Sequence, residues 1–295
     1  MRSLKQIVEY HQFGAADGHP VIYFHGTPGS AEECQVFDRY GKANNLVIIC
    51  YDRSTLDPQL EGVAYYQRIA DEITDKVAGK PVDFVGFSMG AFIALQVCQA
   101  MNGKVRSLHL VSAAAPLDAD NFIDLMAGKA VFRLAQHNPF TFLLLARLQG
   151  CLARRIFPGL LFHMLFSSAA GEDKTLVADK SFRATIIRGL KTCFNHPQAY
   201  VRDIKAYVQP WKESLPDITV STTIWHGAKD NWSPAAMAEY LESAIPGWAS
   251  TEVLNDLSHY SCLYRAIPEI CRQLNPASGD QRDHSTLSED IHAEN

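Results

Sequence analysis

The segment Gly86–Gly90 constrains the fold of this chain more than any other feature of the sequence. It reads Gly-Phe-Ser-Met-Gly and lies at the end of a predicted strand, Val82–Phe87. A largely apolar helix is predicted next, over Phe92–Met101. A tight turn from a strand into a helix pushes the Ser88 hydroxyl clear of the backbone, and side chains at both glycine positions would clash with neighbouring backbone. The sequence therefore predicts a serine nucleophile on a strained turn.

Strands and helices alternate on both sides of this turn, with short links between them. Such alternation implies right-handed crossovers and an α/β fold with a doubly wound, mostly parallel sheet. Further strands are predicted at Val21–Phe24, Leu46–Tyr51, Val105–Val111, Val220–Trp225 and Glu252–Leu254. Helical spacing of apolar residues is found at Val63–Ala78, Ala235–Ala244 and Leu263–Leu274.

The alternation stops between residues 117 and 208. This stretch is rich in Leu, Phe and Ala at helical spacing and has no convincing strand, so we expect an all-helical cap inserted into a core made of residues 1–116 and 209–275. Residues 276–295 hold five acidic side chains and one arginine, with little apolar sequence. We predict that they form a disordered acidic tail.

Composition excludes several classes of protein. Hydrophobic residues make up 47% and charged residues 20%, which suits a globular chain. The net charge of -5 argues against a basic nucleic-acid binder. No apolar stretch is long enough to span a membrane, and none near the start suggests a signal peptide. The seven cysteines are dispersed and form no CxxC pair, so we expect reduced thiols in a cytoplasmic protein.

A serine hydroxyl needs a base to take its proton and a carboxylate to orient that base. Asp230 directly follows the predicted strand at 220–225, and His259 follows the one at 252–254. The order Ser88, Asp230, His259 places each residue just beyond the end of a strand, so we predict these three as the catalytic residues.

Other residues offer alternatives to parts of this triad. Asp118 or Asp120, after the strand at 105–111, is the rival acid, but a run of alanines separates Asp118 from its strand. His226 is better explained as a core histidine at a strand end, and Cys262 as a packed thiol. The chain has no His, Cys or carboxylate spacing typical of metal ligands and no nucleotide-binding motif, so neither a metal nor another cofactor is expected.

The oxyanion of an acyl-transfer intermediate needs at least two backbone N–H donors. Met89, directly after the nucleophile, supplies one. The second is expected from the loop after Val21–Phe24, where Thr27 is the choice because Pro28 has no N–H to donate.

These motifs together resemble the α/β-hydrolase fold superfamily, over about residues 4 to 275. The resemblance is carried by His25–Ser30, Tyr51-Asp52-Arg53, Gly86–Gly90, Gly227–Asp230 with Pro234, and Ser258-His259-Tyr260. It implies an eight-stranded sheet, with Leu4–Gln12 as an antiparallel first strand, and it implies the triad Ser88, Asp230 and His259. The pair Asp52-Arg53 is interpreted as structural. The loop after it reads Ser54-Thr55-Leu56-Asp57-Pro58 where such proteins are often rich in glycine, which weakens inference about specificity.

The leading functional hypothesis is a serine hydrolase that cleaves a carboxylic ester or lactone of a small apolar substrate through an acyl-enzyme. Two alternatives stay open: a small-molecule sensor of the same fold with little turnover, and a C–C bond hydrolase or peptidase with the same triad. The expected partner is a small-molecule substrate, with no nucleic acid and no membrane span.

The density of apolar residues between Pro139 and Phe166 exceeds the single stripe that a helix pair needs for docking. We therefore expect a second apolar surface in the cap, which lines a pocket above Ser88 or buries against a partner subunit in a homodimer. The alternative is that all of these residues pack inside the cap. Residues 117–208 also carry 12 basic against 7 acidic side chains. A net positive cap could attract anionic leaving groups.

Overall fold

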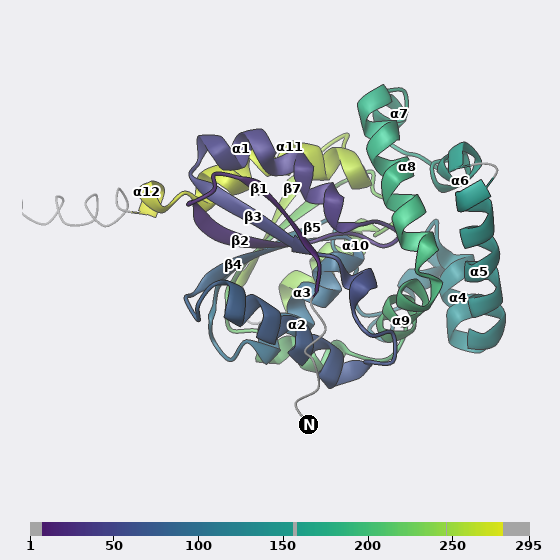
Figure 1. The fold of residues 1–295 in the computed structure, drawn as a ribbon, viewed down its shortest axis with the longest axis horizontal. Coiled ribbons are helices and arrows are strands. Elements are labelled where there is room, and N and C mark those ends of the chain that lie inside the picture. The colour runs from purple at the N-terminus through teal and green to yellow at the C-terminus, as the bar shows by residue number, and fades with distance from the viewer. Residues whose placement is uncertain (1–7, 156–157, 246, 280–295) are drawn as a thin grey trace, which may run out of the picture.

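The computed structural model describes residues 8–155, 158–245 and 247–279 (Figure 1). Its centre is a sheet of seven strands in the order β1-β3-β2-β4-β5-β6-β7. The strands are β1 (Tyr10–Gly14), β2 (His19–Phe24), β3 (Leu46–Tyr51), β4 (Val82–Phe87), β5 (Val105–Val111), β6 (Ser221–Gly227) and β7 (Ala249–Leu254). β1 is antiparallel to β3, and all other neighbouring strands are parallel.

Helices cover both faces of the sheet. In Figure 1, α1 and α11 lie over one face, and α2 and α3 lie over the other. Every residue of β3 and β4 is buried, as expected for parallel strands covered on both faces. The helices of this core are η1 (Ala31–Phe37), α1 (Asp38–Ala43), η2 (Arg53–Thr55), α2 (Gly62–Lys76), α3 (Met89–Ala100), η4 (Lys212–Asp217), α10 (Ala235–Ala244), α11 (His259–Leu274) and α12 (Pro276–Gly279).

The predicted α/β class and mostly parallel sheet are confirmed, with three corrections. The described residues form seven strands, one fewer than the resemblance implied. The antiparallel first strand begins at Tyr10 and not at Leu4, and residues 4–7 lie outside the described residues. The predicted tail begins with a short helix at Pro276–Gly279, whose backbone continues from α11, while residues 280–295 lie outside the described residues.

Residues 117–208 contain helices and, within their described part, no strand. These helices lie together beyond one end of the sheet (Figure 1). They are η3 (Phe122–Leu125), α4 (Lys129–His137), α5 (Pro139–Arg155), α6 (Pro158–Leu165), α7 (Asp173–Leu176), α8 (Lys180–Asn195) and α9 (Pro197–Tyr207). None of the helices described is long and apolar enough to cross a membrane.

The apolar residues of α5 and α6 divide between an inner and an outer surface. Phe140, Leu144 and Leu148 are spaced four apart on α5 and all three are exposed. Leu161 and Leu165 of α6 line an internal cavity instead. The two surfaces explain why α5 and α6 have more apolar residues than a helix pair needs to pack on the core.

Candidate active site

Ser88 occupies a strained turn between β4 and α3. Its φ of 56° lies in the left-handed region, which a residue with a side chain rarely adopts. Neighbouring backbone leaves no room for a side chain beside it, since a Cβ on Gly86 would lie 2.6 Å from Ala91 Cα and one on Gly90 would lie 2.0 Å from the carbonyl oxygen of Phe24. The sequence Gly-x-Ser-x-Gly is thus needed for this turn to form.

The end of β5 ties the Ser88 turn to the segment that carries His259. The backbone N–H of Ser88 donates to the carbonyl oxygen of Val111 over 2.9 Å. The hydroxyl of Ser112, the next residue, donates to the carbonyl oxygen of His259, also over 2.9 Å. In addition, the ring centroid of Phe87 lies 4.9 Å from that of His259. The fold therefore brings the serine and the histidine together from segments about 170 residues apart in the chain.

Asp230 and His259 form a buried pair. Nδ1 of His259 lies 2.8 Å from Oδ2 of Asp230, and both side chains are almost completely buried. The other carboxylate oxygen, Oδ1, accepts hydrogen bonds from the backbone N–H groups of Trp232 and Ser233. A carboxylate can only accept, so Nδ1 of the neutral imidazole carries the proton and Nε2 is left as the acceptor. This tautomer is the one that a general base needs.

The environment of His259 shifts its pKa in two directions. Burial alone lowers the pKa of the imidazole, but the charge of Asp230 and the hydrogen bond to it raise the pKa by more. The negative charges of Asp173 and Glu33 add to the upward shift. The net result is a pKa above the ordinary value of 6.5.

Asp173 of α7 fixes the start of the helix on which His259 lies. Its two carboxylate oxygens accept hydrogen bonds from the backbone N–H groups of Tyr260 and Ser261, over 3.1 and 2.7 Å. These N–H groups belong to the first turn of α11, where intrahelical partners are lacking. Asp173 was not among the predicted site residues, because a lone aspartate far from any motif gives no signal of such a contact.

Thr27 and Met89, the predicted oxyanion-hole residues, both lie beside Ser88 along the same cavity. Met89 is the first residue of α3, so its N–H is one of those without an intrahelical acceptor. Arg53 contacts the loop that contains Thr27. One guanidinium nitrogen of Arg53, Nη2, lies 3.1 Å from both the carbonyl oxygen of His25 and the hydroxyl of Thr27.

Arg53 in turn belongs to a buried network that reaches α9. Its Nε donates to Oδ2 of Asp203 over 3.1 Å, and the hydroxyl of Tyr65 donates to Oδ1 over 2.9 Å. Arg202 donates to the same Oδ1 and to the carbonyl oxygen of Arg53. Arg53 is therefore structural, as predicted from the sequence, and it also contacts the loop of the predicted oxyanion hole.

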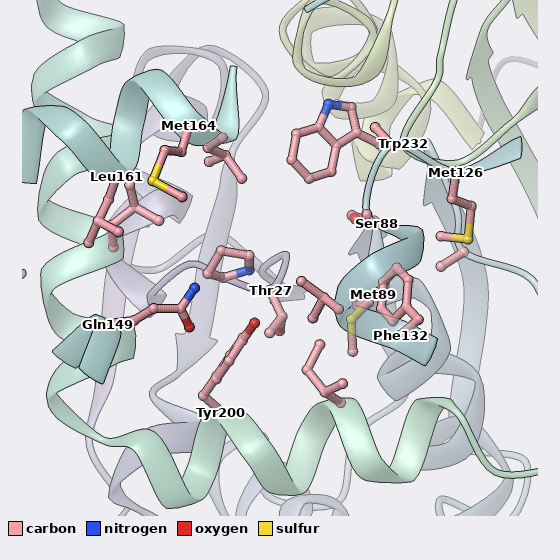
Figure 2. Close-up of a pocket in the computed structure, with 18 of the residues that line it drawn as sticks. Thr27, Ser88, Met89, Met126, Phe132, Gln149, Leu161, Met164, Tyr200 and Trp232 are labelled. Carbon is pink, nitrogen blue, oxygen red and sulfur yellow. The ribbon is translucent and has the colours of Figure 1, made fainter. Parts of the chain in front are cut away.

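A cavity of about 230 Å³ lies between Ser88 and the helices of residues 117–208 (Figure 2). Most of its lining is apolar, including Met126, Phe132, Leu161 and Met164. The polar side chains that line it are those of Thr27, Ser88, Gln149, Tyr200, Trp232 and Ser233. None of the described residues in this lining carries a formal charge, so the cavity suits a neutral, largely apolar group.

The remaining candidates from the sequence have other contacts. Asp118 accepts a hydrogen bond from the backbone N–H of Trp211, and Asp120 from that of its neighbour Asn121. His226 is buried, with Nε2 2.9 Å from the carbonyl oxygen of Ser233, and burial lowers its pKa. Burial also raises the pKa of the Cys262 thiol to about 12, which opposes formation of a thiolate.

Comparison with known proteins agrees with this layout. A family model described as alpha/beta hydrolase fold matches residues 19–266. No curated protein gives a significant match. Similar solved structures include a bromoperoxidase from Bacillus anthracis, which is 17% identical with a TM-score of 0.65 over 89% of this chain and 93% of that one.

Two further structures are similar to this chain to the same degree. An esterase from Exiguobacterium antarcticum is 18% identical with a TM-score of 0.62, over 90% of this chain and 95% of that one. Est816, described as an N-acyl homoserine lactone degrading enzyme, is 18% identical with a TM-score of 0.63, over 90% and 96% of the two chains. At identities this low, the similarity shows a shared fold and no more.

Proposed function

This chain belongs to the α/β-hydrolase fold family, and from that premise we propose that it is a serine hydrolase acting on a carboxylic ester or lactone of a small, largely apolar substrate. The observation that carries the proposal is the buried Asp230–His259 pair, 2.8 Å apart, beside a strained turn that presents Ser88 to an apolar cavity. An uncharged cavity favours a neutral acyl group over a charged one.

The proposed reaction proceeds in two halves. Oγ of Ser88 attacks the carbonyl carbon while Nε2 of His259 takes the hydroxyl proton, and the backbone N–H groups of Thr27 and Met89 hold the oxyanion. The imidazolium then gives this proton to the leaving alkoxide, and the acyl-enzyme remains. Water, deprotonated by His259, attacks the acyl carbon and releases the acid, with Ser88 reprotonated. Asp230 keeps the imidazole in the required tautomer throughout.

Both the similar solved structures and the site support an ester or lactone as the bond that is cleaved. One solved neighbour is named as an esterase and another as a lactone-degrading enzyme. Both ester and lactone carbonyls are attacked by a serine of this kind, and both leave an alkoxide that His259 can protonate. We therefore propose an oxygen ester rather than an amide as the bond that is cleaved.

Labelling with a fluorophosphonate probe tests this proposal. The probe reacts with an activated serine, so we expect peptide mapping to place the label on Ser88 and a panel of simple esters to be hydrolysed. The variant Ser88→Ala should lose labelling and turnover while its melting temperature stays close to that of the wild type. Ser243→Ala, at an exposed position on α10, is the matched control and should retain both activities.

Two outcomes would contradict the proposal. Ordinary ester turnover by Ser88→Ala would exclude Ser88 as the nucleophile. A single round of acylation without sustained turnover on any ester would favour the small-molecule sensor instead.

A further inference from the structure

Gln149 places an unused hydrogen-bond acceptor at the wall of the cavity. It lies on α5 and lines the cavity, and Figure 2 shows its amide pointing inward. Its Oε1 atom is inaccessible to solvent and has no hydrogen-bond partner among the described residues. A buried amide oxygen without a hydrogen-bond partner is destabilising, because it has lost its bonds to water and gained none in return. Such destabilisation at a cavity wall points to a ligand group that satisfies the oxygen when bound.

Tyr200 adds a hydrogen-bond donor on the same side of the cavity. Its ring is held from two sides by Phe142 and Phe194, with ring centroids 5.6 and 5.2 Å away. Figure 2 shows its hydroxyl directed into the cavity, as is the amide of Gln149, and in this view both side chains enter from the side away from Ser88. Burial raises the pKa of this hydroxyl, so it stays protonated and able to donate.

The two groups together define the chemistry of what they can bind. Oε1 of Gln149 accepts a hydrogen bond, whereas Nε2 of Gln149 and the hydroxyl of Tyr200 donate. A secondary amide matches this set, because its N–H donates to one group and its carbonyl oxygen accepts from another. A ketone or an ether leaves the Gln149 oxygen unpartnered. A carboxylate would face that oxygen with no cation in the described lining to compensate its charge.

We propose that Gln149 and Tyr200 form a binding site for a neutral amide group of the substrate, at the side of the cavity away from Ser88. The preferred substrate is then an ester or lactone whose apolar part carries an amide that is bound but not cleaved. The identity of the bond that reacts rests on the proposed function. The amide group is inferred from Gln149 and Tyr200 alone.

Matched ester substrates test the proposal by kinetics. One set carries a –CO–NH– unit at several positions along the acyl chain, and the other sets carry –CO–CH₂– or –CH₂–CH₂– at the same positions. For at least one position we expect kcat/KM of the amide to exceed that of its ketone counterpart by roughly tenfold, as one added hydrogen bond to a buried group predicts. In Gln149→Met this ratio should fall to about one. Tyr200→Phe should reduce the ratio in part.

Gln136→Met is the matched control, because Gln136 is an exposed glutamine on α4 outside the cavity lining. It should leave the amide preference unchanged. Equal kcat/KM for amide and ketone at every position, or an amide preference that survives Gln149→Met, would overturn the proposal.

A binding measurement separates failure of this inference from failure of the proposed function. The amide, ketone and all-methylene compounds are titrated into Ser88→Ala, and Trp232 fluorescence reports binding because its indole lines the cavity. Tighter binding of the amide that is lost in Ser88→Ala/Gln149→Met supports the site even where no ester is hydrolysed. Equal affinity for all three compounds overturns it even where Ser88 is an active nucleophile.

Discussion

At the scale of single residues, His259 determines how activity should depend on pH. The base must be neutral to accept the serine proton, and burial, which lowers its pKa, is outweighed by the charge and hydrogen bond of Asp230. We therefore expect kcat/KM to rise with pH through a pKa above 6.5 and then to level off. A pH–rate profile with a fast-reacting ester measures this. A profile that is flat between about pH 5 and 9 would exclude a histidine base.

The same profile measured on Asp230→Asn tests the origin of the shift. Loss of the carboxylate removes the two largest contributions that raise the pKa of His259, so the midpoint should move to lower pH. The wrong imidazole tautomer should also lower kcat by about 10⁴. Asp118→Asn is the control and should change neither quantity, because that carboxylate caps a backbone N–H of Trp211 instead. A larger loss in Asp118→Asn than in Asp230→Asn would assign the acid to the rival position.

Residue-level prediction from sequence succeeds where a role depends on local chain geometry. The turn at Ser88 and the missing N–H of Pro28 follow from a few neighbouring residues. The contacts of Asp173 with α11 and of Arg53 with the Thr27 loop join segments far apart in the chain. No periodicity or motif encodes such contacts, so the sequence gives no sign of them. The same holds for Gln149, whose role depends on which cavity wall it faces.

At the scale of elements, the Arg53–Asp203 pair connects helix α9 to the loop that holds Thr27. Asp203→Asn would leave the buried guanidinium groups of Arg53 and Arg202 without their counter-charge. Breaking a buried pair in this way costs about 3–5 kcal/mol in the free energy of unfolding. We expect a loss of that size in urea denaturation, together with a lower kcat because the Thr27 loop is no longer fixed.

Lys205 provides the control on the same helix. Its ion pair with Glu61 spans 3.1 Å but both partners are well exposed, so Lys205→Ala should cost only about 0–1 kcal/mol. Equal destabilisation by Asp203→Asn and Lys205→Ala would mean that the buried network does not anchor α9.

Most elements were predictable from their apolar patterns. The strands at Leu46–Tyr51, Val82–Phe87 and Val105–Val111 have the predicted bounds, because most of their residues are apolar and buried. The last strand begins at Ala249, earlier than predicted. Its start gave no apolar signal in the sequence, because half of the strand is exposed. Helix α11 begins at His259 rather than Leu263. At this start the Ser261 hydroxyl accepts a hydrogen bond from the backbone N–H of Ser258, and Asp173 accepts from the N–H groups of the first turn.

At the scale of the whole molecule, the mostly parallel sheet follows from the alternation of strands and helices, but the cavity does not follow from the sequence. Its volume is set by how the helices of residues 117–208 pack over the sheet, and this depends on contacts between distant segments. The density of apolar residues in α5 and α6 did indicate two apolar surfaces. The outer one, on Phe140, Leu144 and Leu148, is exposed in the single chain, and burial of this surface in a homodimer stays one of the alternatives that the sequence left open.

The size of the cavity sets the acyl chain length that the enzyme should prefer. At about 230 Å³ it is smaller than the roughly 300–1,000 Å³ of most ligand pockets. Each added CH₂ that enters it should gain up to about 0.8 kcal/mol, or about fourfold in kcat/KM, until the space is filled. A series of linear esters from acetate to dodecanoate should therefore show kcat/KM rising and then levelling off or falling at intermediate length. A steady decline beyond acetate would mean that the apolar lining serves packing alone.

An enlarged cavity should move this optimum. Leu190 of α8 is buried and lines the cavity, so Leu190→Ala adds space that a longer chain can fill. Leu241 of α10 is also buried but lies outside the lining, so Leu241→Ala should cost a similar 2–5 kcal/mol or so of stability without changing the preferred length. The same shift in both variants would indicate general loosening of the fold. A shift to longer esters in Leu190→Ala alone would place the acyl chain between Ser88 and the helices of residues 117–208.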